Sequence, residues 1–482
     1  MLRHTKIVAT MGPSTSSYAD IEAIILAGAN VLRLNFSHGE ADDHRERARI
    51  IREVAAKNHK FVAILADLQG PKIRIARFKE NKIELEDGDT FILNSKLGYQ
   101  DGDKYQVGID YLALITDSSP GDVLLLDDGR VVLEVTAVTP QTITTIVTTG
   151  GPLSNNKGIN RLGGGLSAKA LTDKDKADII VAAEIKADYI AVSFPRDAND
   201  MHEARALLQA AGSKAGLVAK IERAETIADD EVLDDIIRAS EVVMVARGDL
   251  AVEIGDAALV GVQKHIIRRA RSLNKIVITA TQMMESMISS PMPTRAEVSD
   301  VANAVFDHTD AVMLSAETAA GQYPVQAVEA MDRICRGAEQ SRNLAKSGHR
   351  LYEEFDNIDE TIALAAIYTA NHLDGVKAII CMTESGATPK QATRLRTTLP
   401  VFALSDNPET QTKVAMYRNV HTIPFSSIKM QVNEINQRAI DEIVKTGCAK
   451  TGDLVVITKG DYVNAQGGTN TLKIVKIGDK IQ

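Results

Sequence analysis

Two short stretches, Val218-Ala-Lys-Ile-Glu-Arg223 and Val245-Ala-Arg-Gly-Asp-Leu250, decide the fold of this chain. Each begins as an apolar run typical of a β-strand and ends in charged residues. The charged side chains that they deliver are Lys220, Glu222, Arg247 and Asp249. Two carboxylates and a lysine at the ends of neighbouring strands suit a divalent cation and a phosphate group. A single charged strand end is ordinary, because it solvates the edge of a sheet, but several in register indicate a site.

Eight strand-like runs of this kind lie outside one inserted segment, and most precede an amphipathic helical stretch. This alternation predicts parallel βα units, and eight units predict a closed (β/α)8 TIM barrel with its active site at the C-terminal strand ends. The predicted strands are Lys6–Thr10, Val31–Leu34, Phe61–Asp67, Tyr189–Ser193, Leu217–Lys220, Val242–Ala246, Ile276–Thr279 and Ala311–Leu314. The polar residues that follow or end them are Arg33, Asn35, Ser37, Asp67, Ser193, Lys220, Glu222, Arg247, Asp249, Thr281, Ser315 and Glu317. We expect these residues to share one active site.

The βα rhythm breaks after Asp67 and gives way to short, alternating, turn-rich runs. These predict a small β-barrel domain that is inserted over the mouth of the barrel as a lid. Near the C-terminus a separate α/β rhythm begins with a helix at Ile358–His372. Its predicted strands are Ala378–Met382, Val401–Leu404, His421–Pro424, Asp453–Thr458 and Leu472–Val475. We therefore expect a discontinuous catalytic barrel (1–70 and 168–345), an inserted β lid domain (71–167) and a C-terminal α/β regulatory domain (346–482).

The composition argues against several classes of partner. The net charge is −9 and the pI is near 5.7, which disfavours nucleic acids and anionic membranes because both require a basic face. The N-terminus runs directly into the first strand without a signal peptide, and no apolar run reaches the roughly 18–20 residues of a membrane span. We expect a cytoplasmic protein that holds an anionic substrate with local Arg and Lys side chains and a metal.

Motifs over essentially the whole chain resemble those of one enzyme family, the pyruvate kinases, and most nearly its bacterial members. The motifs are Thr5-Lys-Ile-Val-Ala-Thr-Met-Gly-Pro13, Arg33-Leu-Asn-Phe-Ser-His-Gly39, Asp67-Leu-Gln-Gly-Pro-Lys-Ile-Arg74, Lys220-Ile-Glu222, Ala246-Arg-Gly-Asp-Leu250, Thr279-Ala-Thr-Gln-Met-Met-Glu-Ser-Met287, Pro293-Thr-Arg-Ala-Glu-Val-Ser-Asp-Val-Ala-Asn303 and Met313-Leu-Ser-Ala-Glu-Thr318. Each is short, but their joint presence in this order is specific. The resemblance implies transfer of a phosphoryl group from phosphoenolpyruvate to ADP, which gives pyruvate and ATP in the last step of glycolysis.

The resemblance also implies roles for the catalytic residues. Lys220 matches the lysine that stabilises the transition state, and Arg33 matches a phosphate-binding arginine. Glu222 and Asp249 offer hard oxygen ligands to Mg²⁺ or Mn²⁺. The residues that match substrate-binding positions are Arg33, Lys220, Gly248, Asp249 and Thr281, and Thr281 also lies near the point where enolpyruvate receives its proton. The residues that match nucleotide-contacting positions are Asn35, Phe36, Ser37, His38, Arg74 and the lid residue Lys157.

One position departs from many relatives. Members of the family that need K⁺ carry glutamate at the position of Lys72, with threonine and lysine in place of Leu68 and Gln69. Their K⁺ pocket matches Asn35, Ser37, Asp67 and the carbonyl of Leu68. Because the Lys72 ammonium can supply the charge that the ion otherwise gives, we expect K⁺ to be dispensable here.

In relatives the C-terminal domain binds a phosphorylated effector on the loop that matches Thr383-Glu-Ser-Gly-Ala-Thr388. The hydroxyls of Thr383, Ser385 and Thr388 precede a predicted helix and suit a phosphate, although ordinary helix capping explains Ser385 or Thr388 equally well. Sugar monophosphates and AMP fit better than a bisphosphate, because the sequence has no obvious second basic cluster. Since relatives are homotetramers, we expect the same of this chain, with allosteric coupling between subunits.

Two other functions remain open from the sequence. A metal-dependent lyase or aldolase that acts on pyruvate enolate shares the pair of acidic metal ligands, but it has no need of Arg33, Arg74 and Lys157 on the nucleotide side. A non-catalytic metabolite sensor on the same fold would be free to lose Lys220 and Thr281. Dependence of pyruvate release on ADP separates the first from a kinase, and any turnover excludes the second.

Overall fold

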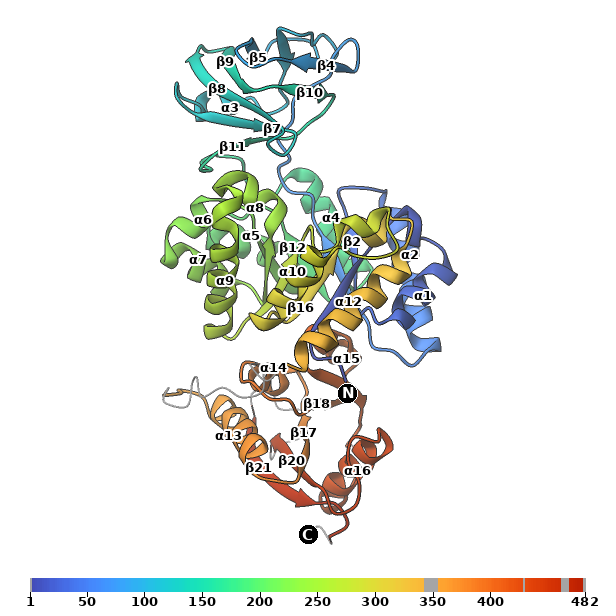
Figure 1. The fold of residues 1–482 in the computed structure, drawn as a ribbon. Coiled ribbons are helices and arrows are strands. Elements are labelled where there is room, and N and C mark those ends of the chain that lie inside the picture. The colour runs from blue at the N-terminus through green and yellow to red at the C-terminus, as the bar shows by residue number, and fades with distance from the viewer. Residues whose placement is uncertain (1, 342–353, 428–429, 461–467, 480–482) are drawn as a thin grey trace.

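The protein consists of three units stacked along one axis, with the barrel in the middle (Figure 1). The structure is a computed structural model, and it describes residues 2–341, 354–427, 430–460 and 468–479. The inserted β unit lies above the barrel in Figure 1, and the C-terminal α/β unit lies below it, next to the N-terminus.

Eight parallel strands close the central barrel in the order β1-β16-β15-β14-β13-β12-β3-β2, as the sequence predicts. They are β1 (Lys6–Met11), β2 (Val31–Asn35), β3 (Ala63–Asp67), β12 (Tyr189–Val192), β13 (Gly216–Ile221), β14 (Val242–Ala246), β15 (Ile276–Ala280) and β16 (Ala311–Leu314). Nearly all of their residues are buried, because helices cover the outside of the barrel while side chains fill its interior. This burial explains why the strands are almost continuously apolar until their C-terminal ends.

The helices of the barrel begin at the capping residues that the sequence provides. At the start of α4, for example, the Thr172 hydroxyl accepts the amide hydrogen of Asp175 at 3.2 Å, and the Asp175 carboxylate accepts that of Thr172 at 2.9 Å. The helices are α1 (Tyr18–Ala27), α2 (Ala41–Lys57), α4 (Asp173–Glu184), α5 (Ala198–Ala210), α6 (Glu225–Ala228), α7 (Asp230–Ala239), α8 (Arg247–Ile254), α9 (Asp256–Ser272), α10 (Arg295–Phe306), α11 (Ala316–Ala319) and α12 (Pro324–Glu339). Among all the residues that the structure describes, no helix combines the length and apolar character needed to cross a bilayer.

The inserted unit consists of two sheets, where the sequence predicted one small barrel. A six-stranded sheet has the order β11-β7-β8-β9-β5-β6, and β10 pairs with β4 in a separate sheet. The chain leaves β9 through Gly150 and Gly151, and the latter has φ of 147°, which favours glycine and turns the strand toward β4. The elements are β4 (Lys82–Leu85), β5 (Thr90–Asn94), β6 (Gln106–Gly108), α3 (Leu114–Asp117), β7 (Val123–Leu126), β8 (Val131–Val138), β9 (Thr142–Thr149), β10 (Gly151–Ser154) and β11 (Ile159–Arg161).

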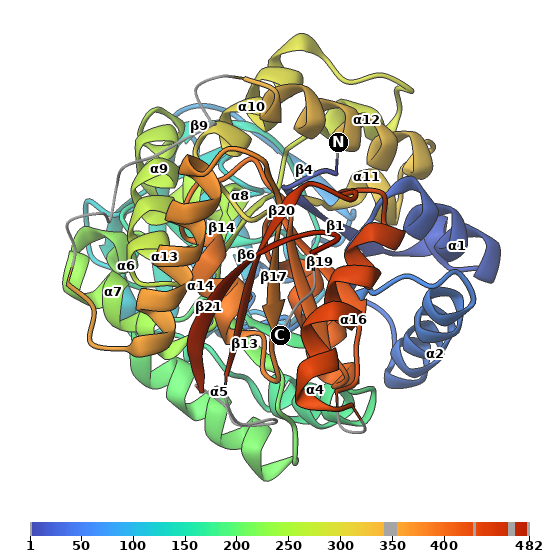
Figure 2. The same cartoon turned by 90° about the horizontal axis from the view of Figure 1, so that it is seen from below.

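The C-terminal unit is a five-stranded sheet with helices on both faces, as predicted. Its order is β19-β18-β17-β20-β21, and only the last pair is antiparallel. Seen from below, α13 and α14 lie on one side of the strands and α16 on the other (Figure 2). The elements are α13 (Ile358–His372), β17 (Val376–Met382), α14 (Ala387–Thr393), β18 (Val401–Ser405), α15 (Pro408–Lys413), β19 (Val420–Pro424), α16 (Val432–Lys445), β20 (Leu454–Gly460) and β21 (Thr469–Lys476). The predicted boundary at 345–346 lies outside the described residues.

A buried ion pair joins the C-terminal unit to the floor of the barrel. Arg394 follows α14, and its guanidinium pairs with Asp310, which immediately precedes β16; the side chains of both are 0% exposed. The second carboxylate oxygen of Asp310 accepts the amide hydrogen of Val277 at 2.9 Å. Asp310 therefore neutralises the Arg394 guanidinium and also accepts a backbone hydrogen bond from the second residue of β15, Val277.

We expect Asp310→Asn to lower the free energy of unfolding by about 3–5 kcal/mol, because it leaves the Arg394 charge buried without its partner. Urea unfolding of the full chain measures this change. The matched control is Asp235→Asn, which removes an exposed partner of Arg238 and is expected to cost less than about 1 kcal/mol. Equal losses of unfolding free energy in the two variants would show that the buried pair contributes no more to stability than an exposed one.

Candidate active site

A cavity of about 210 Å³ lies where the barrel strands end, between the barrel and the inserted unit. Both units contribute to its wall, because Lys72, Arg74, Asp128 and Asn160 come from the inserted segment while Arg33, Asp67, Lys220, Glu222 and Asp249 come from the barrel. The predicted site residues that line it are Arg33, Asn35, Ser37, His38, Asp67, Leu68, Lys72, Arg74, Lys220, Glu222 and Asp249. The structure thus brings together side chains from β2, β3, β13 and the start of α8.

Lys220 lies at the centre of this cavity. Its ammonium donates a hydrogen bond to the Ser193 hydroxyl at 2.8 Å and lies 2.9 Å from Glu222 Oε1 and 3.5 Å from Asp67 Oδ1. Burial by itself lowers the pKa of Lys220, but the charges of Asp67 and Glu222 outweigh that effect and raise it. Lys220 is therefore a permanent cation.

Asp67 fixes the position of two cations. Its Oδ2 accepts a hydrogen bond from Arg33 Nε at 2.6 Å, while Arg33 Nη1 donates to the Thr10 hydroxyl at 3.1 Å. Burial tends to raise the pKa of Asp67, but Lys220 and Arg33 hold it below its ordinary value. The guanidinium of Arg33 is thereby held rigidly against the barrel and leaves Nη2 for a ligand.

Glu222 and Asp249 have the character of a cation site. Glu222 Oε2 accepts the amide hydrogen of Phe194 at 2.8 Å, whereas Oε1 is buried and makes no hydrogen bond of good geometry. Burial, opposed by Lys220 and reinforced by Asp249, raises the pKa of Glu222 to about 7. Burial also raises the pKa of Asp249, against the opposing charges of Lys220 and Lys72. A buried carboxylate and a half-buried one, both with raised pKa values, fit a bound divalent cation.

Thr281 and Gly248 lie beside Asp249, although neither lines the cavity itself. The Thr281 hydroxyl accepts the amide hydrogen of Gly248 at 2.8 Å. Thr281 has φ of 68°, a left-handed conformation that strains a β-branched residue. Arg247 holds it there, donating to the Thr281 carbonyl at 2.7 Å and pairing with Asp300 at 2.7 Å. Arg247 is therefore a positioning residue and is not available to bind substrate.

The predicted nucleotide-side residues divide into two groups. His38, Asn35, Ser37 and Arg74 line the cavity. Phe36 does not, because its ring is buried and stacks on His44 with centroids 4.0 Å apart. Lys157 is also outside the lining, because its ammonium pairs with Asp127 of the inserted unit at 2.7 Å.

Three of the four predicted K⁺ ligands, Asn35, Asp67 and the Leu68 carbonyl, already have partners. Asn35 Oδ1 accepts the amide hydrogen of Ser37 at 3.1 Å, and the Leu68 carbonyl accepts the hydroxyl of Ser193 at 2.8 Å. The Asp67 carboxylate serves the two cations already described. Lys72 is exposed and lines the same cavity.

Sequence reasoning missed the residues that connect the two units. Arg223 is buried and donates to the carbonyls of Leu166 at 2.8 Å and Ala168 at 3.1 Å, on the segment that returns from the insert. The main-chain carbonyl of Glu253 accepts the amide hydrogen of Gly163 at 2.9 Å. The side-chain carboxylate of Glu253 accepts the amide hydrogen of Ala224 at 2.8 Å. The position of Arg223 directly after Glu222 was a usable signal, but nothing in the sequence pointed to Glu253.

The predicted effector loop makes internal contacts in this structure. The Thr383 hydroxyl accepts the amide hydrogen of Gly386 at 2.9 Å. Thr388 is buried, and its hydroxyl is 2.7 Å from that of Thr469. Ser385 lies in the wall of a cavity between the loop and the barrel. Of the three hydroxyls, the structure thus leaves Ser385 the most accessible.

Comparisons with known proteins agree with this architecture. The barrel-domain model of pyruvate kinase matches residues 2–328, and the alpha/beta-domain model of pyruvate kinase matches residues 360–475. The chain is 57% identical to pyruvate kinase II of Salmonella typhimurium, over 99% of both proteins. It is also 57% identical to a pyruvate kinase of Haemophilus influenzae, over 98% of this chain and 97% of the relative.

A solved structure gives the same result. A pyruvate kinase from Cryptosporidium parvum superposes with a TM-score of 0.91 at 31% identity, over 98% of this chain and 96% of the other. These comparisons favour neither a lyase or aldolase nor a non-catalytic sensor. Family models on both sides of the chain and full-length relatives together show that this chain belongs to the pyruvate kinase family, whose members are phosphotransferases.

Proposed function

We propose that this chain transfers the phosphoryl group of phosphoenolpyruvate to ADP within the cavity between the barrel and the inserted unit. The observation that carries the proposal is the arrangement of Lys220 between Asp67 and Glu222, with Arg33 fixed beside it. Phosphoryl transfer needs positioning and neutralisation of charge more than covalent help. A cationic centre flanked by two carboxylates, one of which is also a candidate metal ligand, meets that need.

Lys220 acts as a charge and not as a base. Because its pKa is raised, its ammonium stays protonated while the phosphoryl group passes and an enolate is left behind. It stabilises the negative charge on both. Arg33 presents its remaining N–H groups to the phosphate, in the planar geometry that suits phosphate oxygens.

Glu222 and Asp249 would hold Mg²⁺ or Mn²⁺. When bound, such an ion neutralises the charge of the substrate oxygens and orients them. Oε1 of Glu222, which is buried and has only the ion pair with Lys220 and no hydrogen bond of good geometry, supports this assignment.

Thr281 and the amides at the start of α8 bind the carboxylate end of the substrate. The Thr281 hydroxyl lies near the carbon of enolpyruvate that receives a proton, which arrives through water. Arg247 and Asp300 preserve the left-handed backbone on which this position of the hydroxyl depends.

The nucleotide binds on the side of the cavity that Asn35, Ser37, His38 and Arg74 line. Phe36 contributes through its packing on His44, which orients the loop. Lys157 must break its ion pair with Asp127 before its ammonium can contact the nucleotide phosphates. Closure of the inserted unit as a lid supplies that movement.

The experiment that tests the proposed reaction is pyruvate release from phosphoenolpyruvate and Mg²⁺, with and without ADP. We expect release to require ADP. Release at the same rate without ADP would support a lyase or phosphatase in place of a kinase.

We expect K⁺ to be dispensable, because Lys72 adds a positive charge to the cavity and three of the predicted K⁺ ligands, Asn35, Asp67 and the Leu68 carbonyl, already have partners. Turnover in buffer free of K⁺ is expected to lie within about twofold of turnover with K⁺. Lys72→Glu is expected to lower the K⁺-free rate by about tenfold or more, and added K⁺ is expected to restore it.

The matched control is Lys79→Glu, which changes an exposed lysine of the inserted unit by the same charge. Its activity is expected to remain independent of K⁺. Near-zero turnover of the unmodified enzyme without K⁺ would contradict the role of Lys72.

The regulatory properties form a separate part of the proposal. The divisions at 70–71, 167–168 and 345–346 separate a catalytic, a lid and a regulatory domain.

A phosphorylated effector binds the loop at 383–388, where Ser385 is the hydroxyl that lines a cavity. The enzyme is a cytoplasmic homotetramer. Light scattering of the purified chain tests the tetramer, and activation by AMP or a sugar monophosphate tests the effector.

A further inference from the structure

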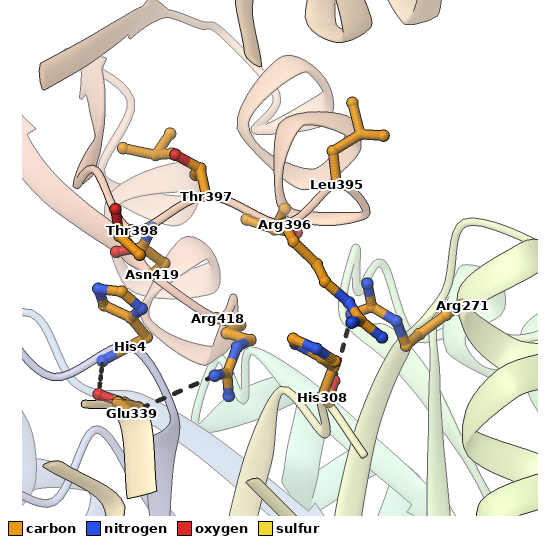
Figure 3. Close-up of a pocket in the computed structure, with 12 residues that line it drawn as sticks. His4, Arg271, His308, Glu339, Leu395, Arg396, Thr397, Thr398, Arg418 and Asn419 are labelled. Carbon is orange, nitrogen blue, oxygen red and sulfur yellow. Dashed lines mark hydrogen bonds and ion pairs between the residues drawn. The ribbon is translucent and has the colours of Figure 1, made fainter. Parts of the chain in front are cut away.

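A second cavity lies at the opposite end of the barrel from the active site, against the C-terminal unit (Figure 3). His4 precedes β1, and Arg271 lies in the last turn of α9, so the barrel contributes the ends at which its strands begin. The C-terminal unit contributes Arg396, which follows α14, and Arg418, which precedes β19. The cavity has a volume of about 20 Å³.

The wall of this cavity carries more positive than negative charge. Arg271, Arg396 and Arg418 line it, and Glu339 is the one carboxylate among the residues that line it. Glu339 is already committed, because its two oxygens accept the amide hydrogens of His4 at 2.9 Å and Thr5 at 2.7 Å. Its distance to Arg418 Nη2 is 4.0 Å, too long for a hydrogen bond.

The carboxylate of Asp310, which lies 3.4 Å from the amide nitrogen of Arg418, is also occupied. It pairs with Arg394 and accepts the amide hydrogen of Val277. Among the described residues, the guanidinium of Arg271 donates to two main-chain carbonyls, those of His308 at 3.2 Å and Arg394 at 2.9 Å. In the part of the chain that the structure describes, no ion pair to a carboxylate is found for Arg271.

Arg396 has the least support of the three. Its Nε is buried and has no hydrogen-bond partner among the described residues. Figure 3 shows its guanidinium directed toward Arg271 and His308 across the cavity. Burial is the largest cause that lowers the pKa of Arg271, to about 9. The positive charges of Arg394, Arg418 and Arg396 lower it in the same direction. Burial and then Arg418 lower the pKa of Arg396 as well. Two buried guanidiniums and one half-buried guanidinium share a single lining carboxylate, Glu339, so the site has an excess of positive charge that suits an anion.

We propose that this cavity binds a small oxyanion of the phosphate class between Arg271, Arg396 and Arg418. Guanidinium groups present parallel N–H donors that match phosphate oxygens. The volume is too small for a nucleotide or a sugar, but Thr397 and Thr398 also line the cavity, and Thr398 is exposed. The phosphate group of a monoester can therefore enter while the rest of the molecule remains outside.

The anion would link the two units, because its ligands come from both. Arg271 belongs to the barrel, and Arg396 and Arg418 belong to the C-terminal unit. Binding therefore stabilises the folded chain by mass action. It does so at a distance from the catalytic residues, which lie at the other ends of the strands.

Thermal unfolding of the full chain in inorganic phosphate, compared with sodium chloride at the same ionic strength, tests the proposal. The unmodified protein is expected to unfold about 2–4 °C higher in phosphate at saturating concentration. Arg396→Gln removes the ligand whose Nε has no hydrogen-bond partner among the described residues, and it is expected to lose more than half of that shift. Arg438→Gln, an exposed arginine of α16, is the matched control and is expected to retain the whole shift.

The comparison between variants separates this cavity from the active site, where Arg33 and Lys220 also attract phosphate. Arg396→Gln is expected to keep its basal turnover, which shows that it is folded. A full phosphate shift in Arg396→Gln would overturn the proposal. Glycerol 3-phosphate identifies the source of the ligand: an equal, Arg396-dependent shift indicates a monoester, and a shift with inorganic phosphate alone indicates the free ion.

Discussion

Lys220→Met is expected to lower kcat by about 10³-fold or more while the chain remains folded. Methionine preserves the length of the side chain but removes the ammonium that contacts both Asp67 and Glu222. The phosphoryl group and the enolate then lose their nearest positive charge. Because the effect lies in the transition state, kcat should fall far more than the affinity for phosphoenolpyruvate.

The control for this substitution is Lys60→Met, which removes an exposed lysine remote from the cavity. Its kcat is expected to match that of the unmodified enzyme. Circular dichroism of both variants verifies the fold. Normal kcat in Lys220→Met would overturn the mechanism proposed for this residue.

Glu222→Gln is expected to weaken Mn²⁺ binding by about 10–100-fold and to lower kcat/KM by about 10³-fold. The amide keeps the shape of the side chain and can still accept the amide hydrogen of Phe194, but it loses the charge that holds the ion. Electron paramagnetic resonance of free Mn²⁺ measures binding directly, without reference to activity.

Glu203→Gln provides the comparison, because it removes an exposed carboxylate that pairs with Lys176. Mn²⁺ affinity in this variant should remain that of the unmodified enzyme. If Glu222→Gln bound Mn²⁺ equally well, the ion would have to be held elsewhere.

The barrel and the C-terminal unit could be predicted closely from the sequence because their signals are local. Each barrel strand is a largely apolar run with polar residues at or near its C-terminal end, and α13 occupies the range predicted for it, Ile358–His372. The convergence of Lys220, Glu222 and Asp249 follows from the same logic, since parallel strands end at one face of a barrel.

Other features depend on contacts that the sequence pattern does not contain. The strand β10 leaves its neighbour β9 for β4 because of the backbone at Gly151. Lys157 pairs with Asp127, and Arg247 turns toward Thr281 and Asp300. Each case concerns the direction of a side chain or the pairing of distant strands, and periodicity fixes neither.

The measurement that tests the central claim most directly is the ratio of ATP to pyruvate formed from phosphoenolpyruvate, ADP and Mg²⁺, followed by phosphorus NMR in a single sample. The account predicts one ATP for each pyruvate, with the signal of phosphoenolpyruvate lost as the γ-phosphate of ATP appears. Pyruvate accompanied by inorganic phosphate, with ADP unchanged, would contradict it.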